Sequence, residues 1–271
     1  MSWKNEETTL RNLVVLGRAA PEEMSDGRQT VCTGAWSPDR GFIRLYPIDP
    51  QENLFSRWDI VHAEVERNAA DARHESWKIK GRKRGQEEKV KVIDKYPRHK
   101  RATLLYHLED ECVQDINKEK RSLGIIRPSS TPELKFEPWD ENDEPGQQAK
   151  LFEEIEESRP ETREEFDFNI KSRYSCSNCK TKQGYHEQTL LEWGAYMGLK
   201  NNAKSTLQLE NNYRFHDENY RYWMFVGNMN QYKNTFIIIS IIWLKNDIEI
   251  NSTIESFPKT ADRAITICFS T

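Results

Sequence analysis

The first half of the chain alternates short apolar runs with polar turns. Residues 30–36 and 41–48 are rich in β-branched and aromatic side chains, and the connection between them has the proline and glycine that a tight hairpin turn favours. Residues 59–66 alternate apolar and polar side chains, which is typical of a strand with one buried face. Short strands joined by short turns predict a small β barrel or sandwich. The expected strands cover residues 13–16, 30–36, 41–48, 59–66 and 90–93.

The second half combines helical and strand patterns. Apolar positions spaced for a helix predict one over residues 98–120, and another is expected over 186–197, after a strand at 166–170. Residues 220–227 and 235–244 predict a hairpin at the centre of a second sheet. Its second strand is apolar on both faces and should be covered on both sides.

The composition between these halves predicts a domain boundary. Residues 131–165 contain most of the acidic excess and several prolines, so we expect a linker there, with a surface helix at 147–158. Residues 246–271 show no clear pattern. The sequence thus predicts an α+β protein in four segments: a β domain at 10–130, the acidic linker at 131–165, an α/β domain at 166–245 and a tail at 246–271.

The clearest chemical motif is a pair of cysteines followed by a histidine. Cys176 and Cys179 have the spacing with which a tight turn holds one metal ion, and His186 is a third possible ligand, as in a structural zinc knuckle. His216, Cys268, a carboxylate or a partner chain could supply the fourth. The alternative is a pair of reduced structural cysteines in a turn. A thioredoxin-like redox pair is less favoured because the motif lies in a polar loop.

Composition and charge bear on the cellular compartment and on the surface of the protein. Five scattered cysteines and no N-terminal apolar segment favour a reducing, cytoplasmic compartment, and the longest apolar run, at 236–244, is too short to span a bilayer. The net charge of −4 hides an asymmetry: residues 73–101 hold twelve Lys or Arg and four acidic residues, whereas residues 133–167 hold fourteen acidic and four basic residues. The pattern indicates a basic working surface and an acidic connector, or two solvated loops.

The basic, aromatic-containing segment makes nucleic-acid binding the first functional hypothesis. Lysine and arginine neutralise phosphates, and exposed aromatic rings stack on bases. The alternatives are a metal-dependent nuclease, although no P-loop, GxSxG or HExxH motif is present, and a non-catalytic adaptor that binds a protein through the acidic linker. Trp36 and Tyr46 are equally compatible with core positions. The nucleic-acid-binding candidates are Trp36, Arg44, Tyr46, Trp58, Trp77, Lys78, Lys80, Arg82, Lys83 and Arg84.

Residues 30–48 and 59–65 resemble bacterial proteins that carry a dual OB-fold-containing domain, which have a cysteine-containing strand, a Gly-aromatic-Ile-Arg strand and an Asp-Ile-Val strand in this order. The chain over residues 10–245 is also similar to a bacterial family with an OB-like N-terminal region and a Cys-x-x-Cys…His C-terminal region. The resemblance implies an OB-like small β-barrel, DNA or RNA as partner, and, by analogy alone, a role in genome maintenance or mobile-element defence.

Overall fold

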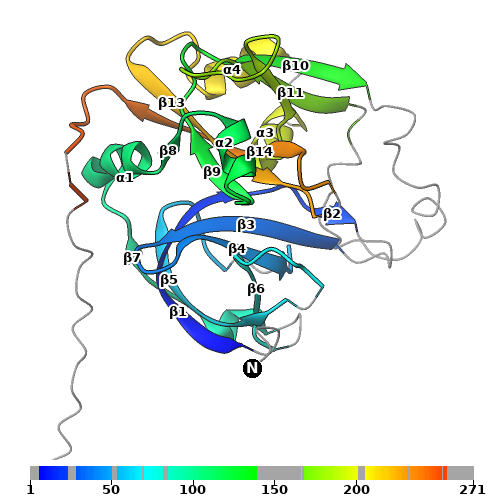
Figure 1. The fold of residues 1–271 in the computed structure, drawn as a ribbon, viewed down its shortest axis with the longest axis vertical. Coiled ribbons are helices and arrows are strands. Elements are labelled where there is room, and N and C mark those ends of the chain that lie inside the picture. Colours follow the sequence, from blue (N-terminus) through cyan, green and yellow to red (C-terminus); the bar gives the residue numbers. More distant parts are fainter. Residues whose placement is uncertain are drawn as a thin grey trace, which may run out of the picture.

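The computed structural model describes residues 6–23, 29–50, 54–68, 70–81, 85–138, 166, 168–200, 205–230, 232–251 and 253–254. More of these residues lie in strands than in helices, and the helices are short. The strands form two parts that pack against each other: a barrel built from the first half of the chain, and a mixed part built mainly from the second half (Figure 1).

The barrel is closed by five strands: β1 (Glu7–Arg18), β3 (Gln29–Ser37), β4 (Gly41–Ile48), β5 (Asp59–Arg67) and β6 (Ser76–Ile79). β1 pairs with both β3 and β5, which closes the ring, and the order around it is β1-β3-β4-β6-β5. The β4–β6 pair is parallel and the other pairs of the ring are antiparallel. Two further strands attach at the margins: β2 (Glu22–Glu23) beside β3, and β7 (Val90–Lys95) beside β5. The predicted small barrel is therefore confirmed.

Both faces of the barrel wall are buried along β1, which explains its apolar run. Leu13 and Val15 belong to the core inside the barrel, whereas Val14 and Leu16 belong to a second core between the barrel and the rest of the protein. Successive side chains of a strand point to opposite faces, so an apolar residue at every position is what a wall covered on both sides requires.

Among the described residues, the second part has two sheets and four short α-helices. Its larger sheet has the order β14-β13-β9-β8, and its smaller sheet has the order β10-β11-β12. The strands are β8 (Glu109–Asp110), β9 (Leu123–Ile126), β10 (Glu133–Pro138), β11 (Phe168–Tyr174), β12 (His186–Thr189), β13 (Tyr220–Asn228) and β14 (Phe236–Lys245). The helices are α1 (Arg101–His107), α2 (Val113–Lys118), α3 (Trp193–Lys200) and α4 (Thr206–Asn212). The predicted hairpin of β13 and β14 is confirmed, and β14 is covered on both sides, as its sequence indicates.

Two predicted helices were wrong in their extent. The helix expected over 98–120 is divided into α1 and α2 by β8, because Glu109 and Asp110 pair in parallel with β9. The helix expected over 186–197 starts only at Trp193, since residues 186–189 form β12. In β12, His186 and Gln188 are buried and Glu187 is exposed, so burial there follows the period of a strand. Tertiary pairing overrides local helical spacing in both places.

The barrel and the second part share an extensive contact. Gly34 of β3 lies directly under the ring of Phe225 of β13, where a Cβ atom would be 2.2 Å from two ring carbons. Beside this contact, the Arg57 guanidinium pairs with the Glu192 carboxylate and donates to the Ile241 carbonyl at 3.2 Å. The apolar packing and this ion pair together join the two parts.

The expected linker and tail are described only in part. Residues 133–138 form β10 and pair with β11, whereas 139–165, including the expected surface helix at 147–158, lie outside the described residues. In the tail, Ile248 and Ile250 pack against the core between the two parts. No helix among the described residues has the length and apolar character needed to cross a membrane.

Candidate functional site

The structure places the three predicted tryptophans in the interior. Trp77 is 1% exposed in the core of the barrel, and Trp36 and Trp58 are 8% and 6% exposed in the core between the two parts. Arg44 is 3% exposed, and its Nη2 donates to the Ser122 carbonyl at 3.0 Å. These side chains pack against protein, so in this structure their rings and guanidinium present no free face to a base. The burial of Trp36 agrees with the core position that the sequence analysis gives as the alternative to nucleic-acid binding.

Of the other predicted binding residues, Tyr46, Lys78 and Lys80 are partly exposed on the barrel. Lys78 pairs with Glu66 at 2.7 Å, and Lys80 pairs with Glu7 at 2.5 Å. The hydrogen bond and charge of Glu7 raise the pKa of Lys80. Tyr46 is half-buried. Arg82, Lys83 and Arg84 lie outside the described residues.

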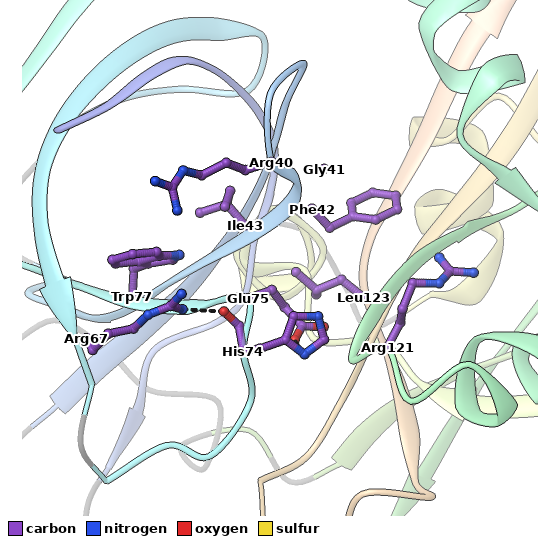
Figure 2. A pocket seen from close by; sticks show the side chains of 10 residues that line it. All are labelled: Arg40, Gly41, Phe42, Ile43, Arg67, His74, Glu75, Trp77, Arg121 and Leu123. Atoms are coloured by element: carbon purple, nitrogen blue, oxygen red, sulfur yellow. Dashed lines mark hydrogen bonds and ion pairs between the residues drawn. The ribbon is translucent and has the colours of Figure 1, made fainter. Parts of the chain in front are cut away.

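A pocket of about 370 Å³ lies where the barrel meets the start of β9, and sequence reasoning did not find it (Figure 2). Four separate segments supply its polar walls: the start of β4, the end of β5, the approach to β6 and the approach to β9. Their charged and aromatic members are Arg40, Arg67, Arg121, His74, Glu75 and Trp77.

The arginines of the pocket are held by stacking and by carboxylates. The Arg67 Cζ atom lies 3.7 Å and the Arg40 Cζ atom 5.4 Å from the centre of the Trp77 ring, so the indole supports both guanidinium groups. Glu6 pairs with both arginines, at 3.4 Å to Arg40 and 3.1 Å to Arg67. Arg40 keeps 42% of its side chain exposed and can reach a ligand.

The opposite wall carries Arg121, which pairs with Asp110 and, at 2.8 Å, with Glu119. Burial would lower the pKa of Arg121, but its hydrogen bond to Asp110 raises it, so the guanidinium stays charged. The exposed His74 has its Nδ1 atom 3.2 Å from the buried Glu75 carboxylate. The lining holds three arginines and one carboxylate, and the nearby Glu6, Asp110 and Glu119 pair with these arginines. The attraction of the pocket for an anionic group therefore rests on the donors that Arg40 keeps exposed.

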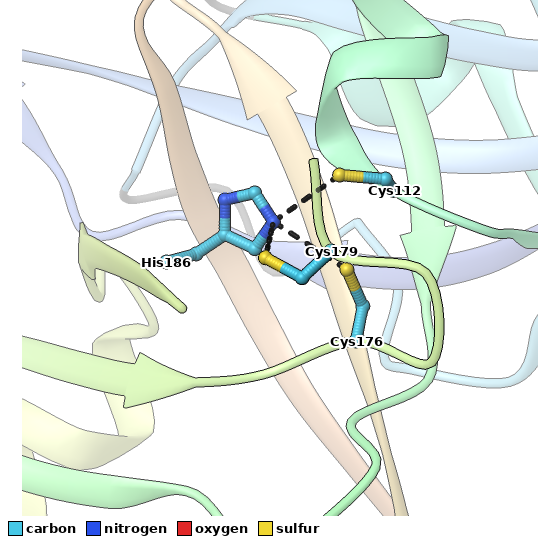
Figure 3. Close-up of side chains that lie close together, drawn as sticks. All are labelled: Cys112, Cys176, Cys179 and His186. Atoms are coloured by element: carbon cyan, nitrogen blue, oxygen red, sulfur yellow. Dashed lines mark hydrogen bonds between the residues drawn. The ribbon is translucent and has the colours of Figure 1, made fainter. Parts of the chain in front are cut away.

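The second candidate site is a cluster of three cysteines and a histidine. The His186 Nε2 atom lies 3.4 Å from the Sγ atom of Cys112 and 3.5 Å from the Sγ atoms of Cys176 and Cys179 (Figure 3). The four ligand atoms all lie within 4.8 Å of one another. This arrangement could hold a metal ion. The structure thus brings the three predicted ligands together and adds Cys112.

The turn that carries the two closely spaced cysteines is fixed by its own polar groups. The Ser175 hydroxyl donates to the Gly184 carbonyl at 2.9 Å, and the Thr181 hydroxyl donates to the Tyr185 carbonyl at 2.8 Å. Gly184 has a φ of +75°, a conformation that glycine adopts without strain. The turn therefore brings Cys179 back towards His186 at the start of β12.

Cys112 reaches the cluster from the segment between β8 and α2. Two contacts bind this segment to the turn: the Asn178 side chain donates to Glu111 at 2.9 Å, and Lys180 pairs with Asp115 at 2.5 Å. The two residues that the sequence analysis names as candidates for the fourth ligand are not in the cluster as described. His216 lies 3.2 Å from Glu210 instead, and Cys268 lies outside the described residues.

The pKa shifts of the cluster residues are compatible with a bound cation. Burial lowers the pKa of His186, which keeps the imidazole neutral and able to bind a metal. Burial also raises the pKa of Cys176, so a nearby cation is needed to stabilise its thiolate. Burial acts in the same direction on Cys179, but hydrogen bonds with Thr181 lower its pKa. The residues present therefore suit a bound metal ion.

Two family models match the sequence. One, described as a domain of unknown function (DUF8758), matches residues 9–106, and the other, described as a domain of unknown function (DUF8757), matches residues 106–260. The second match covers more than half of the chain, which therefore belongs to the DUF8757 family. A search of curated proteins finds no match.

Among solved structures, a murine DNA-binding protein bound to double-stranded DNA is similar to this chain at 9% identity. The alignment covers 88% of this chain and 97% of that one, with a TM-score of 0.29. A TM-score this low does not establish a shared fold.

Proposed function

We propose that this member of the DUF8757 family is a nucleic-acid-binding protein that contacts phosphates at the arginine pocket and carries a structural zinc ion in its second part. The observation that carries the proposal is the convergence of Arg40, Arg67 and Arg121 on one pocket beside the barrel. Arginine binds phosphate oxygens through a planar fork of donors and stacks on rings, and both properties serve nucleic-acid recognition.

The barrel supports the same function through its topology. Counted along the ring, its five strands have the order first, second, third, fifth, fourth, with the third and fifth strands parallel. We assign this arrangement to the OB-like barrels, five-stranded Greek-key barrels that commonly bind oligonucleotides. The pocket lies against this barrel, beside the start of the third strand, β4.

The geometry of the cysteine cluster supports zinc as its ion. Zinc bonds of about 2.3 Å to sulfur and about 2.0 Å to nitrogen, at a tetrahedral angle, place the two ligand atoms about 3.5 Å apart. The three distances from His186 Nε2 to sulfur are 3.4, 3.5 and 3.5 Å. Three thiolates and one imidazole leave no position for water, which is the pattern of a structural site. The ion would hold α2 against the turn after β11.

Metal analysis of the purified protein tests the zinc proposal. We expect about one zinc per chain in the wild type and a loss of most of it in Cys112→Ser, since a missing ligand weakens a four-coordinate site. Cys268→Ser is the matched control and should keep its zinc. A wild type without bound zinc after expression in zinc-supplemented medium would remove the site, and loss only in Cys268→Ser would identify that residue as the fourth ligand.

Binding to labelled oligonucleotides tests the nucleic-acid proposal. Fluorescence anisotropy should show affinity for DNA or RNA that falls steeply as salt rises, because bound phosphates release counterions. In Arg40→Gln, the loss of one phosphate contact should weaken single-strand binding about fivefold at 0.1 M salt and make the salt dependence shallower. Arg173→Gln is the control, since Arg173 also pairs with an exposed glutamate and lies 4.6 Å from the ring of Tyr185, but away from the pocket. No binding at low salt by the wild type would refute the proposal.

A further inference from the structure

The tip of the β13–β14 hairpin exposes two large side chains. Tyr232 is 62% exposed, the highest value among the large apolar and aromatic side chains that the structure describes, and Met229 is 39% exposed. The tip is closed by backbone hydrogen bonds from Met229 N to the Thr235 carbonyl at 3.2 Å and from Thr235 N to the Tyr232 carbonyl at 2.9 Å. An aromatic ring is thus presented to solvent on a closed turn.

This tip lies beside the arginine pocket. The Asn228 amide donates to the carbonyl of Ser122 at 2.9 Å, and Ser122 stands between the pocket residues Arg121 and Leu123. On the other side, Asn230 donates to the Ala70 carbonyl at 3.5 Å, in the segment that leads to the pocket residue His74. The hairpin tip therefore borders the edge of the pocket.

The contact between the tip and the pocket edge is fixed by a buried ion pair. Arg73, which precedes His74, donates to the Asn228 carbonyl at 2.8 Å and pairs with the buried Asp71 at 2.6 Å. The Asn228 side chain in turn donates to the Lys233 carbonyl at 2.9 Å, within the tip itself. A backbone held in place before binding lowers the conformational entropy lost when a ligand stacks on the side chain that it carries.

We propose that Tyr232 is a stacking platform for a base of a single-stranded nucleic acid whose neighbouring phosphate lies in the arginine pocket. The inference rests on the proposed function and names its ligand: a single strand, because the bases of a duplex are already stacked on each other and offer no free face. The arginine pocket would bind the backbone and the exposed ring would bind the base, which are the two parts of single-strand recognition.

The test compares Tyr232→Ala, Tyr232→Phe and the control Tyr106→Ala, which removes another exposed tyrosine, 47% exposed on α1. Affinities are measured for a single-stranded DNA 12-mer, the same RNA sequence, the matching duplex and a mononucleotide. We expect Tyr232→Ala to weaken single-strand binding about tenfold. Tyr232→Phe and Tyr106→Ala should bind like the wild type. Tyr232→Ala should leave the duplex affinity and the melting temperature unchanged, and it should weaken any binding of the mononucleotide, which carries both a base and a phosphate.

The outcomes separate the two proposals. If Tyr232→Ala binds single strands like the wild type while Arg40→Gln binds them weakly, the stacking role is refuted and the nucleic-acid function stands. If Tyr232→Ala weakens duplex binding equally, the ring contacts the backbone and the stacking role is also refuted. If the wild type binds no oligonucleotide, both proposals fail. A loss for DNA alone or RNA alone identifies which strand the platform takes.

Discussion

The contact between Gly34 and Phe225 gives the sharpest test of how the barrel meets the second part. A methyl group on residue 34 would lie 2.2 Å from two carbons of the Phe225 ring, far inside van der Waals contact. The ring is fully buried and its centre is 6.1 Å from that of Phe42, so it has little room to turn away. Gly34→Ala must therefore displace the ring or separate the two parts.

The expected cost follows from the packing. Overpacking a core by one methyl group costs about 1–3 kcal/mol, and the short distance at Gly34 favours the upper end, about 3 kcal/mol. Phe225→Ala alone should cost about 4 kcal/mol through the cavity that it leaves. In the double variant the new methyl group would have space, so its cost should stay near that of Phe225→Ala alone. A double-mutant cycle should then give a coupling of about 3 kcal/mol.

Urea unfolding followed by tryptophan fluorescence measures these values. Gly194→Ala is the control, because Gly194 lies in α3 with no atom within 4 Å of the added Cβ, and alanine is the better helix former. That variant should be as stable as the wild type or slightly more stable. If Gly34→Ala leaves the unfolding midpoint unchanged, β3 and β13 are not in contact as described, and the shared core of the two parts is refuted.

Three further variants or treatments probe other contacts. Glu192→Ala should lower the unfolding free energy by about 3 kcal/mol, because it leaves the Arg57 guanidinium without its carboxylate; a change below 1 kcal/mol in urea unfolding would contradict a role in joining the two parts. Asp71→Asn should cost about 3 kcal/mol at pH 7. Burial raises the pKa of Asp71, but hydrogen bonds from Arg73 and Ser76 outweigh it, so the folded-state pKa is lowered. This stabilisation is complete above the unfolded-state pKa of about 3.9 and is lost as the pH falls through the lower folded-state pKa. The difference in unfolding free energy between wild type and variant should therefore shrink below about pH 4 and stay constant above pH 6. A zinc chelator should lower the melting temperature of the wild type reversibly and leave Cys112→Ser unaffected; equal melting curves with and without chelator would contradict a structural ion.

The strands of the barrel and the β13–β14 hairpin could be predicted because their signals are local. Alternating side chains, turn residues at 37–41 and a fully apolar strand at 236–244 each identify an element without knowledge of its partners. What the sequence could not show is which face of the barrel wall is covered. Trp36 and Trp58 are buried because the second part packs on the outer face, and nothing in their own segments indicates this contact.

The ligands of the cysteine cluster likewise divide into those with a local sequence signal and one without. Cys176, Cys179 and His186 are close in sequence, so their spacing predicts that they gather. Cys112 lies on a separate segment, and only the tertiary contacts of α2 with the turn bring it near. Its one sequence signal is that it is a further cysteine in a chain with few.

The arginine pocket has no local signal at all. Arg40, Arg67 and Arg121 come from three separate segments, and nothing within any one segment indicates that the three converge. Charge density alone favours the run near residue 80, where Lys78 pairs with Glu66 and Lys80 pairs with Glu7. Local charge density therefore identified basic residues, whereas the strand pairing of the barrel determines which of them converge.

The pairing of β10 with β11 has a consequence for how the chain can be cut. The strands are paired in antiparallel register from Glu133 opposite Arg173 to Pro138 opposite Phe168, so both ends of the acidic connection at 139–167 are anchored to each other. A protease that cleaves this connection would leave two fragments still joined by the ladder and by the packing around it. New chain ends could be created there, or a reporter inserted, while the barrel, the pocket and the cysteine cluster keep their places.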